Sequence, residues 1–161
     1  RDCTVGHAAI LYSGGTTGTS KGILLSNLNF NALALQTGTA GDCLHPGHTM
    51  LSIMPVFHGF GLGVCIHTVL YWGGTAILIP QFDAKSYCKL LGQYKPNYIA
   101  GVPTLFEALL RMEDAQKLDM SQLEGIFPRR TAAETADCGT PKKSARSVAV
   151  CLRITSLSRS I

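Results

Sequence analysis

A short polar loop interrupts the apolar sequence near the start of the chain. Residues 13–22 read S-G-G-T-T-G-T-S-K-G and lie between two apolar runs. Because glycine permits positive φ, consecutive backbone N–H groups of such a loop can converge on one point. Its Ser and Thr hydroxyls add hydrogen-bond donors, and Lys21 adds a positive charge. This combination suits the binding of phosphate oxygens.

The loop does not fit the two most familiar phosphate-binding motifs. Walker A requires a lysine directly between a glycine and a Ser or Thr, whereas Ser20 precedes Lys21 and Gly22 follows it. The GxGxxG spacing is also missing. A second segment, M-P-V-F-H-G-F-G at residues 54–61, places His58 among apolar residues. Taken alone, such a histidine is more often a turn or core residue than a functional one.

The elements around these residues alternate between strand and helix patterns. We expect strands at 8–13, 22–26, 49–57, 75–80 and 97–102, and helices at 26–38, 63–74, 84–95 and 104–112. Such alternation predicts an α/β fold with a mostly parallel sheet flanked by helices. We expect the first strand to be buried.

Several residues are predicted to begin, end or bury these helices. In the helix at 26–38 we expect a cap at Ser26 or Asn27, an end at Gly38, and a buried face with Leu28, Ala32 and Leu35. The helix after Asp83 is expected to be capped by that residue and to end at Pro96. Thr104 and Glu107 are expected to form a capping box.

Composition excludes several classes of protein. A hydrophobic content of 46% with 15% charged residues supplies enough apolar material for a core. Residues 1–127 hold seven Lys and Arg against eight Asp and Glu, so this part is not a nucleic-acid-binding surface. The six cysteines form no CxxC pair, and we expect reduced thiols in a cytoplasmic protein, with Cys65 and Cys88 buried.

The stretch 43–82 contains no Asp, Glu, Lys or Arg, which is also typical of a membrane-spanning helix. Prolines and a glycine pair divide it into pieces shorter than a span requires, so we interpret it as core elements. We expect at most peripheral contact with a membrane.

Residues 12–22, Y-S-G-G-T-T-G-T-S-K-G, resemble the phosphate loop of the adenylate-forming superfamily, with Ser20 where proline is usual. The segment at 54–61 resembles the P-x-F-H-x-x-G segment of these enzymes, and the similarity continues to residue 127. The resemblance implies a fragment of the large N-terminal domain of an acyl-CoA synthetase of the fatty acid–CoA ligase type.

The resemblance also implies the site and its ligands. ATP with Mg²⁺ would be bound, a small carboxylic acid would be the substrate, and coenzyme A would be the co-substrate. His58 and Phe57 would border the acyl pocket. The residues expected at the ATP phosphates are Ser13, Gly14, Gly15, Thr16, Thr17, Gly18 and Lys21.

Alternatives remain at the level of function. The segment could belong to an adenylation domain that loads a carrier protein, or to a non-catalytic nucleotide-binding or interaction module. No adenine-pocket motif, ribose-binding aspartate or catalytic lysine of the superfamily is found, so the chain alone is expected to be inactive.

The chain changes character after residue 127. Residues 128–161 lack aromatic residues and are basic, and we interpret them as an out-of-frame or disordered tail after a partial AMP-binding domain at 1–127. An apolar surface normally covered by the missing part, including Leu105, Phe106, Leu109 and Leu110, is then expected to be exposed and to promote self-association.

Overall fold

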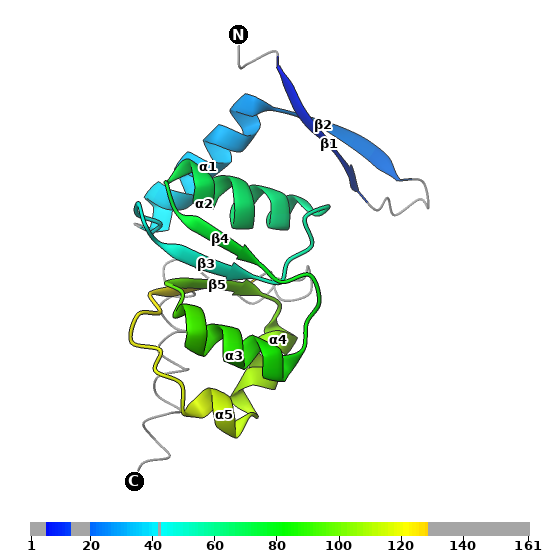
Figure 1. Ribbon diagram of the computed structural model, residues 1–161. Coiled ribbons are helices and arrows are strands. Elements are labelled where there is room, and N and C mark those ends of the chain that lie inside the picture. The colour runs from blue at the N-terminus through cyan, green and yellow to red at the C-terminus, as the bar shows by residue number, and fades with distance from the viewer. Residues whose placement is uncertain (1–5, 14–19, 42, 129–161) are drawn as a thin grey trace, which may run out of the picture. The chain divides into compact units, whose positions relative to one another are not determined.

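The computed structural model of the chain describes residues 6–13, 20–41 and 43–128 (Figure 1). These residues divide into two compact units. The first unit contains the described residues up to His48 together with Met54–Ala76. The second contains Thr49–Ile53 and the described residues from Ile77 onward. The predicted tail and most of the predicted phosphate loop lie outside the described residues.

The first unit begins with a β-hairpin. Strand β1 (His7–Ser13) pairs with strand β2 (Lys21–Ser26) in an antiparallel two-stranded sheet. Both predicted strands are confirmed, but the prediction that the first is buried is wrong. Ile10 and Tyr12 are 57% and 72% exposed. A two-stranded ribbon has no second sheet or helix layer to cover both of its faces, so apolar side chains alone did not indicate burial.

Helix α1 (Asn27–Gly41) begins where the sequence predicted. The Asn29 N–H donates to Ser26 Oγ over 3.2 Å, and the Ser26 N–H donates to Asn29 Oδ1 over 2.9 Å. These reciprocal bonds satisfy backbone donors at the start of the helix, in the manner of a capping box. Ser26 is therefore confirmed as the cap.

The buried face of α1 differs from the predicted one. Phe30 and Ala34 are buried, whereas Leu28 and Leu35 are about half exposed. The helix also continues through Gly38, where a Cβ would collide with the indole ring of Trp72. The Trp72 Nε1–H donates to the Ala34 carbonyl over 2.9 Å. A long-range contact with Trp72 therefore selects the buried face and makes Gly38 a packing residue and not a helix end.

The predicted helix at 63–74 is present, but much of it is wider than an α-helix. It consists of the π-helix η1 (Phe60–Thr68) and the short helix α2 (Val69–Tyr71). The Thr68 hydroxyl donates to the Gly63 carbonyl over 2.8 Å. The helix ends before Gly73, which has a φ of 72°. Helix α1 packs along η1 within this unit.

The sheet of the structure has the strand order β4-β3-β5-β6. Its strands are β3 (Thr49–Ser52), β4 (Thr75–Leu78), β5 (Tyr98–Gly101) and β6 (Gly125–Pro128). Strand β5 is parallel to both β3 and β6. Asn97 fixes the β3–β5 register, because its N–H donates to the Thr49 carbonyl and its Oδ1 accepts from the Thr49 N–H. The predicted α/β fold with parallel strands is confirmed.

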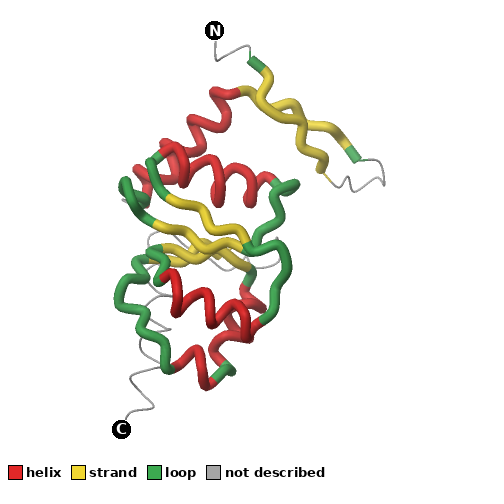
Figure 2. The backbone as a smooth tube through the Cα atoms, viewed as in Figure 1, coloured by secondary structure: helices red, strands yellow, loops and turns green. Residues whose placement is uncertain are grey.

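Three helices of the second unit flank this sheet (Figure 2). They are α3 (Ala84–Tyr94), α4 (Pro103–Leu110) and α5 (Glu113–Gln116). Asp83 caps α3 as predicted, since its Oδ2 accepts from the Ser86 N–H over 2.9 Å. The capping box predicted at Thr104 is wrong: α4 begins at Pro103 with Val102 as its cap. Proline suits the first helical position because the N–H it lacks would have had no helical partner.

The core of the second unit joins these helices to the sheet. Leu51, Ile99 and Ile126 from the strands pack with Tyr87 and Leu91 from α3. Helix α4 also contributes to this core, so the expected exposure of its apolar face is wrong. The residues concerned are Leu105 at 2% exposed, Phe106 at 6%, Leu109 at 3% and Leu110 at 39%. Of these four, only Leu110 agrees with the prediction.

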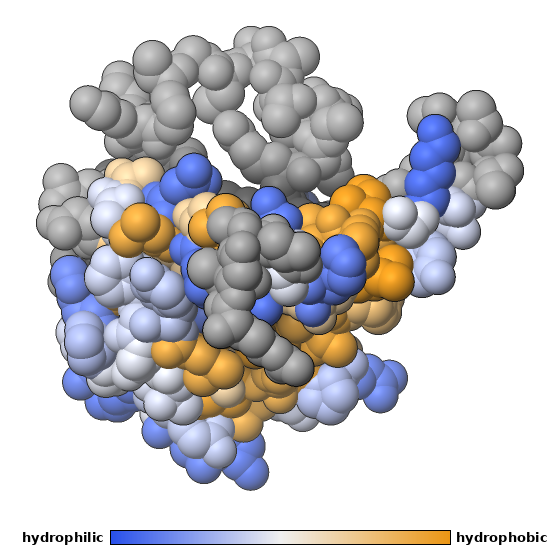
Figure 3. Space-filling view, turned by 90° about the horizontal axis from the view of Figure 1, so that it is seen from above, coloured by the Kyte–Doolittle hydropathy of each residue, from blue (hydrophilic) through white to orange (hydrophobic). Residues whose placement is uncertain are grey.

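Other apolar side chains do lie at the surface, where Figure 3 shows them in orange among polar residues. The exposed fractions of individual side chains place Phe57 and Leu70 of the first unit and Phe82 of the second at the surface. Cys65 and Cys88 are buried, as predicted. Over the part of the chain that is described, no helix has the length and apolar character that a membrane crossing requires.

Candidate functional site

The β1–β2 hairpin holds the two ends of the glycine-rich loop together. In its register Ser13 lies opposite Lys21, and Tyr12 lies opposite Gly22. Ser13 is the last residue of β1 and Lys21 the first of β2. The loop therefore starts and ends at the same end of the hairpin. Gly14, Gly15, Thr16, Thr17 and Gly18 lie outside the described residues, so their predicted phosphate contacts stay predictions.

The pleat of the hairpin gives its two faces different environments. Residues two apart on a strand, and residues opposite each other across an antiparallel pair, share a face. Lys21 therefore lies on the same face as Ile23 and its partner Leu11. Leu11 is half-buried, whereas Tyr12 on the opposite face is 72% exposed. Lys21 thus belongs to the more covered face.

The second predicted segment forms a tight turn that leads into η1. The His58 N–H donates to the Pro55 carbonyl over 3.1 Å, and the Leu62 N–H donates to the His58 carbonyl over 2.9 Å. Gly61 approaches the Pro55 carbonyl so closely that a Cβ there would overlap it. A glycine is therefore required at position 61 of this turn.

The hairpin and the turn meet within the first unit. A Cβ built on Gly59 would lie 3.5 Å from Leu11 Cδ1, which is ordinary van der Waals contact. Leu11, which lies on the face of the hairpin that carries Lys21, thus comes close to Gly59, the residue after His58. Phe57 is 78% exposed and His58 is also exposed. The two segments identified from sequence are therefore neighbours.

The ring of His58 makes a contact that the sequence did not reveal. The Phe60 N–H donates to His58 Nδ1 over 3.0 Å. Phe60 is the first residue of η1, whose preceding residue Gly59 has no side chain to cap it. No sequence pattern predicted this hydrogen bond, because the bond depends on the π-helix beginning two residues after the histidine.

Three other histidines of the first unit, His45, His48 and His67, have structural surroundings. His67 Nε2 lies 3.0 Å from Asn31 Oδ1, and its ring packs against Phe30. The rings of His45 and His48 meet edge to face. Among the residues that the structure describes, no three His, Cys, Asp or Glu side chains come together as a set of metal ligands.

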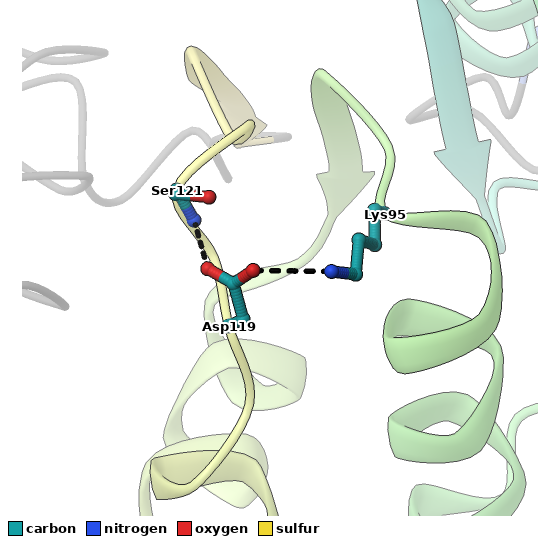
Figure 4. A network of polar contacts seen from close by, with 3 residues as sticks. All are labelled: Lys95, Asp119 and Ser121. Carbon is teal, nitrogen blue, oxygen red and sulfur yellow. Dashed lines mark hydrogen bonds and ion pairs between the residues drawn. The ribbon is translucent and has the colours of Figure 1, made fainter.

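The second unit contains a separate polar network (Figure 4). Lys95 Nζ pairs with Asp119 Oδ2 over 3.1 Å, and the Ser121 N–H donates to Asp119 Oδ1 over 3.1 Å. Hydrogen bonds from the side chain and backbone of Ser121, together with Lys95, lower the pKa of Asp119 to about 2. Both charged groups are well exposed, and the network ties the end of α3 to the segment before β6.

The sequence has clear relatives among curated proteins. It is 38% identical over 119 residues to a long-chain-fatty-acid–CoA ligase of Escherichia coli O6:H1, covering 72% of this chain and 21% of that protein. It is 31% identical over 121 residues to the long-chain-fatty-acid–CoA ligase of Bacillus subtilis, covering 74% and 22%. The chain thus spans about a fifth of the length of these relatives.

Solved structures agree on the fold. ATP-bound MatB from Rhodopseudomonas palustris matches with a TM-score of 0.65 and 28% identity, over 74% of this chain and 23% of that one. A red-emitting luciferase from Phrixothrix hirtus matches with a TM-score of 0.74 over 95% and 28%, and at 22% identity it bears on the fold alone. The AMP-binding enzyme family matches residues 6–150, a range that includes part of the segment after residue 127. The chain therefore belongs to the AMP-binding, or adenylate-forming, enzyme family.

Proposed function

We propose that the chain is part of an ATP-dependent acid–CoA ligase that activates a fatty acid. The observation that carries the proposal is the hairpin, which brings Ser13 and Lys21 together at the ends of the glycine-rich loop. Membership of the AMP-binding family supports ATP as the nucleotide. The long-chain-fatty-acid–CoA ligases among the relatives support a fatty acid as the substrate.

The first half-reaction transfers an adenylyl group to the acid. A carboxylate oxygen of the acid attacks the α-phosphorus of ATP, and the bond from that phosphorus to pyrophosphate breaks. Negative charge accumulates on the leaving pyrophosphate, so positioned donors and cations lower the barrier. In the proposed site, the loop N–H groups and hydroxyls bind the β- and γ-phosphates, and Lys21 neutralises charge. The residues concerned are Ser13, Gly14, Gly15, Thr16, Thr17, Gly18 and Lys21.

The described residues fit this role at the ends of the loop. Lys21 is exposed, and three donors on a flexible stem let an ammonium follow a phosphate group. Gly22, next to it, lies against Ile10 and Tyr12 across the hairpin, which leaves little room for a side chain there. We take Mg²⁺ to enter with ATP, since this ion is commonly held by substrate phosphates together with a few carboxylates.

The second half-reaction forms a thioester. The thiolate of coenzyme A attacks the acyl carbonyl carbon, and the bond from that carbon to the adenylate oxygen breaks. Phe57 offers a large exposed apolar surface beside His58, which suits an apolar acyl group. Both residues are proposed to border the acyl side of the site. A carrier-protein thiol would use the same chemistry, and a comparison of the two acceptors in a longer protein would distinguish them.

Calorimetric titration of the purified chain with MgATP tests the phosphate site. We expect weak binding that is lost in the double variant Lys21→Ala with Thr17→Ala. Lys117→Ala removes an exposed lysine of the second unit and is the matched control, which should bind like the wild type. Equal affinity of the double variant and the control would contradict the proposed site. We expect little pyrophosphate release by the chain alone, because it spans only about a fifth of its relatives.

A further inference from the structure

The β1–β2 hairpin has an apolar face that is largely exposed. Ile10, Tyr12 and Leu24 are 57%, 72% and 51% exposed. Ile10 lies opposite Leu24 in the register of the hairpin, and Tyr12 follows Ile10 by two residues, so the three side chains share a face. A Cβ built on Gly22 would lie 3.2 Å from Ile10 Cγ2 and 3.5 Å from Tyr12 Cε1, so these two side chains lie over the glycine. The hairpin therefore carries an apolar face that is in contact with water.

The outer edge of β1 is also open. Among the residues that the structure describes, β1 pairs with β2 and with no other strand. Alternate residues of such a strand direct their N–H and C=O groups away from the partner, which makes the edge a template for another strand. Charged residues or proline protect many natural edges, but the sequence of β1, H-A-A-I-L-Y-S, contains no Asp, Glu, Lys, Arg or Pro. A register irregularity between His7 and Ala9 affects only its first residues.

Charge does not oppose the contact of two copies of this hairpin. Within the described part of the first unit, Lys21 is the one residue among Asp, Glu, Lys and Arg. It lies at the loop end of the hairpin, opposite Ser13. If two copies of β1 pair antiparallel, their loop ends lie at opposite ends of the joint sheet. The seven residues of β1 span about 23 Å, so the two ammonium groups are separated by more than the Debye length of about 8 Å.

We propose that the chain forms a symmetric dimer in which β1 pairs antiparallel with β1 of a second copy. The two-fold axis passes near Ile10, the middle residue of β1, so Ile10 of one copy lies opposite Ile10 of the other. A second copy fits this edge because a strand paired antiparallel with itself is self-complementary. The pairing joins two ribbons, each marginally stable alone, into one four-stranded sheet and makes their apolar faces continuous. The loops after Ser13 stay at the two ends, so the dimer does not depend on the proposed function.

Two cysteine substitutions of similar exposure test this pairing. Directly opposite residues of an antiparallel pair have Cα atoms about 4.5–5.5 Å apart, which a disulfide spans, so Ile10→Cys should cross-link two copies under mild oxidation. Leu24→Cys lies on the same face, but its two copies are three strand spacings, or about 14 Å, apart and should not cross-link. Peptide mass spectrometry distinguishes the new link from links through the six cysteines already present. Equal or faster cross-linking through position 24 would overturn the proposal.

Sedimentation equilibrium measures the dimer without a cross-link. We expect a concentration-dependent equilibrium of monomer and dimer, since an interface of one strand pair is small. Ile10→Lys places two like charges opposite each other at the axis and should weaken association by at least about tenfold. The control Leu70→Lys changes a residue of α2 that is 60% exposed, and it should associate like the wild type. Equal association of the two variants would overturn the proposal, and so would a wild-type chain that stays monomeric up to about 1 mM.

Discussion

Replacing Tyr87 with phenylalanine is expected to stabilise the chain. Tyr87 is 1% exposed in the core of the second unit, and none of the residues that the structure describes forms a hydrogen bond with its hydroxyl. A buried polar group without a partner costs about 1–3 kcal/mol of folding free energy, because it has lost its bonds to water. Tyr87→Phe removes this group and leaves the ring contact with Phe82 in place. We expect a net gain of about 1 kcal/mol in the free energy of unfolding.

Tyr98 provides a matched control in the same unit. It is 4% exposed, and its hydroxyl donates to Glu124 Oε2 over 3.0 Å. Tyr98→Phe removes the same atom but breaks a bond to a carboxylate, so we expect a loss of about 1 kcal/mol. Urea denaturation of the three proteins, followed by circular dichroism, gives the free energies of unfolding. The two substitutions should shift the midpoint in opposite directions.

The pH dependence supplies a second measurement of the same effect. Burial raises the pKa of the Tyr87 phenol above its ordinary value of 10.0. In the unfolded chain this phenol ionises above about pH 10, whereas in the folded chain it stays neutral, so folding loses stability as the pH rises beyond 10. Tyr87→Phe lacks this loss, and its advantage should grow with pH. A destabilised Tyr87→Phe variant would contradict this prediction and would mean that the hydroxyl has a partner in solution.

Two further predictions concern the Asp119 network and the turn before η1. Ser121 and Lys95 lower the pKa of Asp119 to about 2, so its contribution to stability is present above its ordinary value of 3.8 and is lost as the pH falls toward 2. Urea midpoints between pH 7 and pH 2 should fall less in Asp119→Asn than in the wild type, and parallel curves would contradict this. Gly61→Ala should destabilise the first unit by about 2 kcal/mol or more, because the new Cβ overlaps the Pro55 carbonyl. The control Gly92→Ala meets only the end of the Leu118 side chain within a helix, and it should melt at or above the wild-type temperature.

Much of the fold could be predicted from local sequence patterns. Short apolar runs indicated the strands, and local capping residues such as Ser26 and Asp83 indicated where helices begin. These signals succeed because the responsible contacts are made within a few residues along the chain. The glycine-rich loop was recognised for a similar reason, since its residue types and order are local.

The wrong predictions concern residues whose burial depends on packing against distant parts of the chain. The buried face of α1 depends on Trp72, which is far away in the sequence, and the burial of α4 depends on the core of the second unit. The π-helical form of η1 and the bond from Phe60 to His58 had no local signal. The division at residue 127 stays a prediction, and the family match extends to residue 150.

A residue-resolved NMR titration of the labelled chain with MgATP tests most directly whether the hairpin loop binds the triphosphate. We expect the largest amide shifts at Ser13, Ser20, Lys21 and Gly22, where the loop joins β1 and β2. These shifts should be lost in the double variant Lys21→Ala with Thr17→Ala. If the largest shifts instead occurred in the second unit, around Lys95 and Asp119, the hairpin loop would not be the triphosphate site. Unchanged shifts at the loop ends under saturating MgATP would lead to the same conclusion.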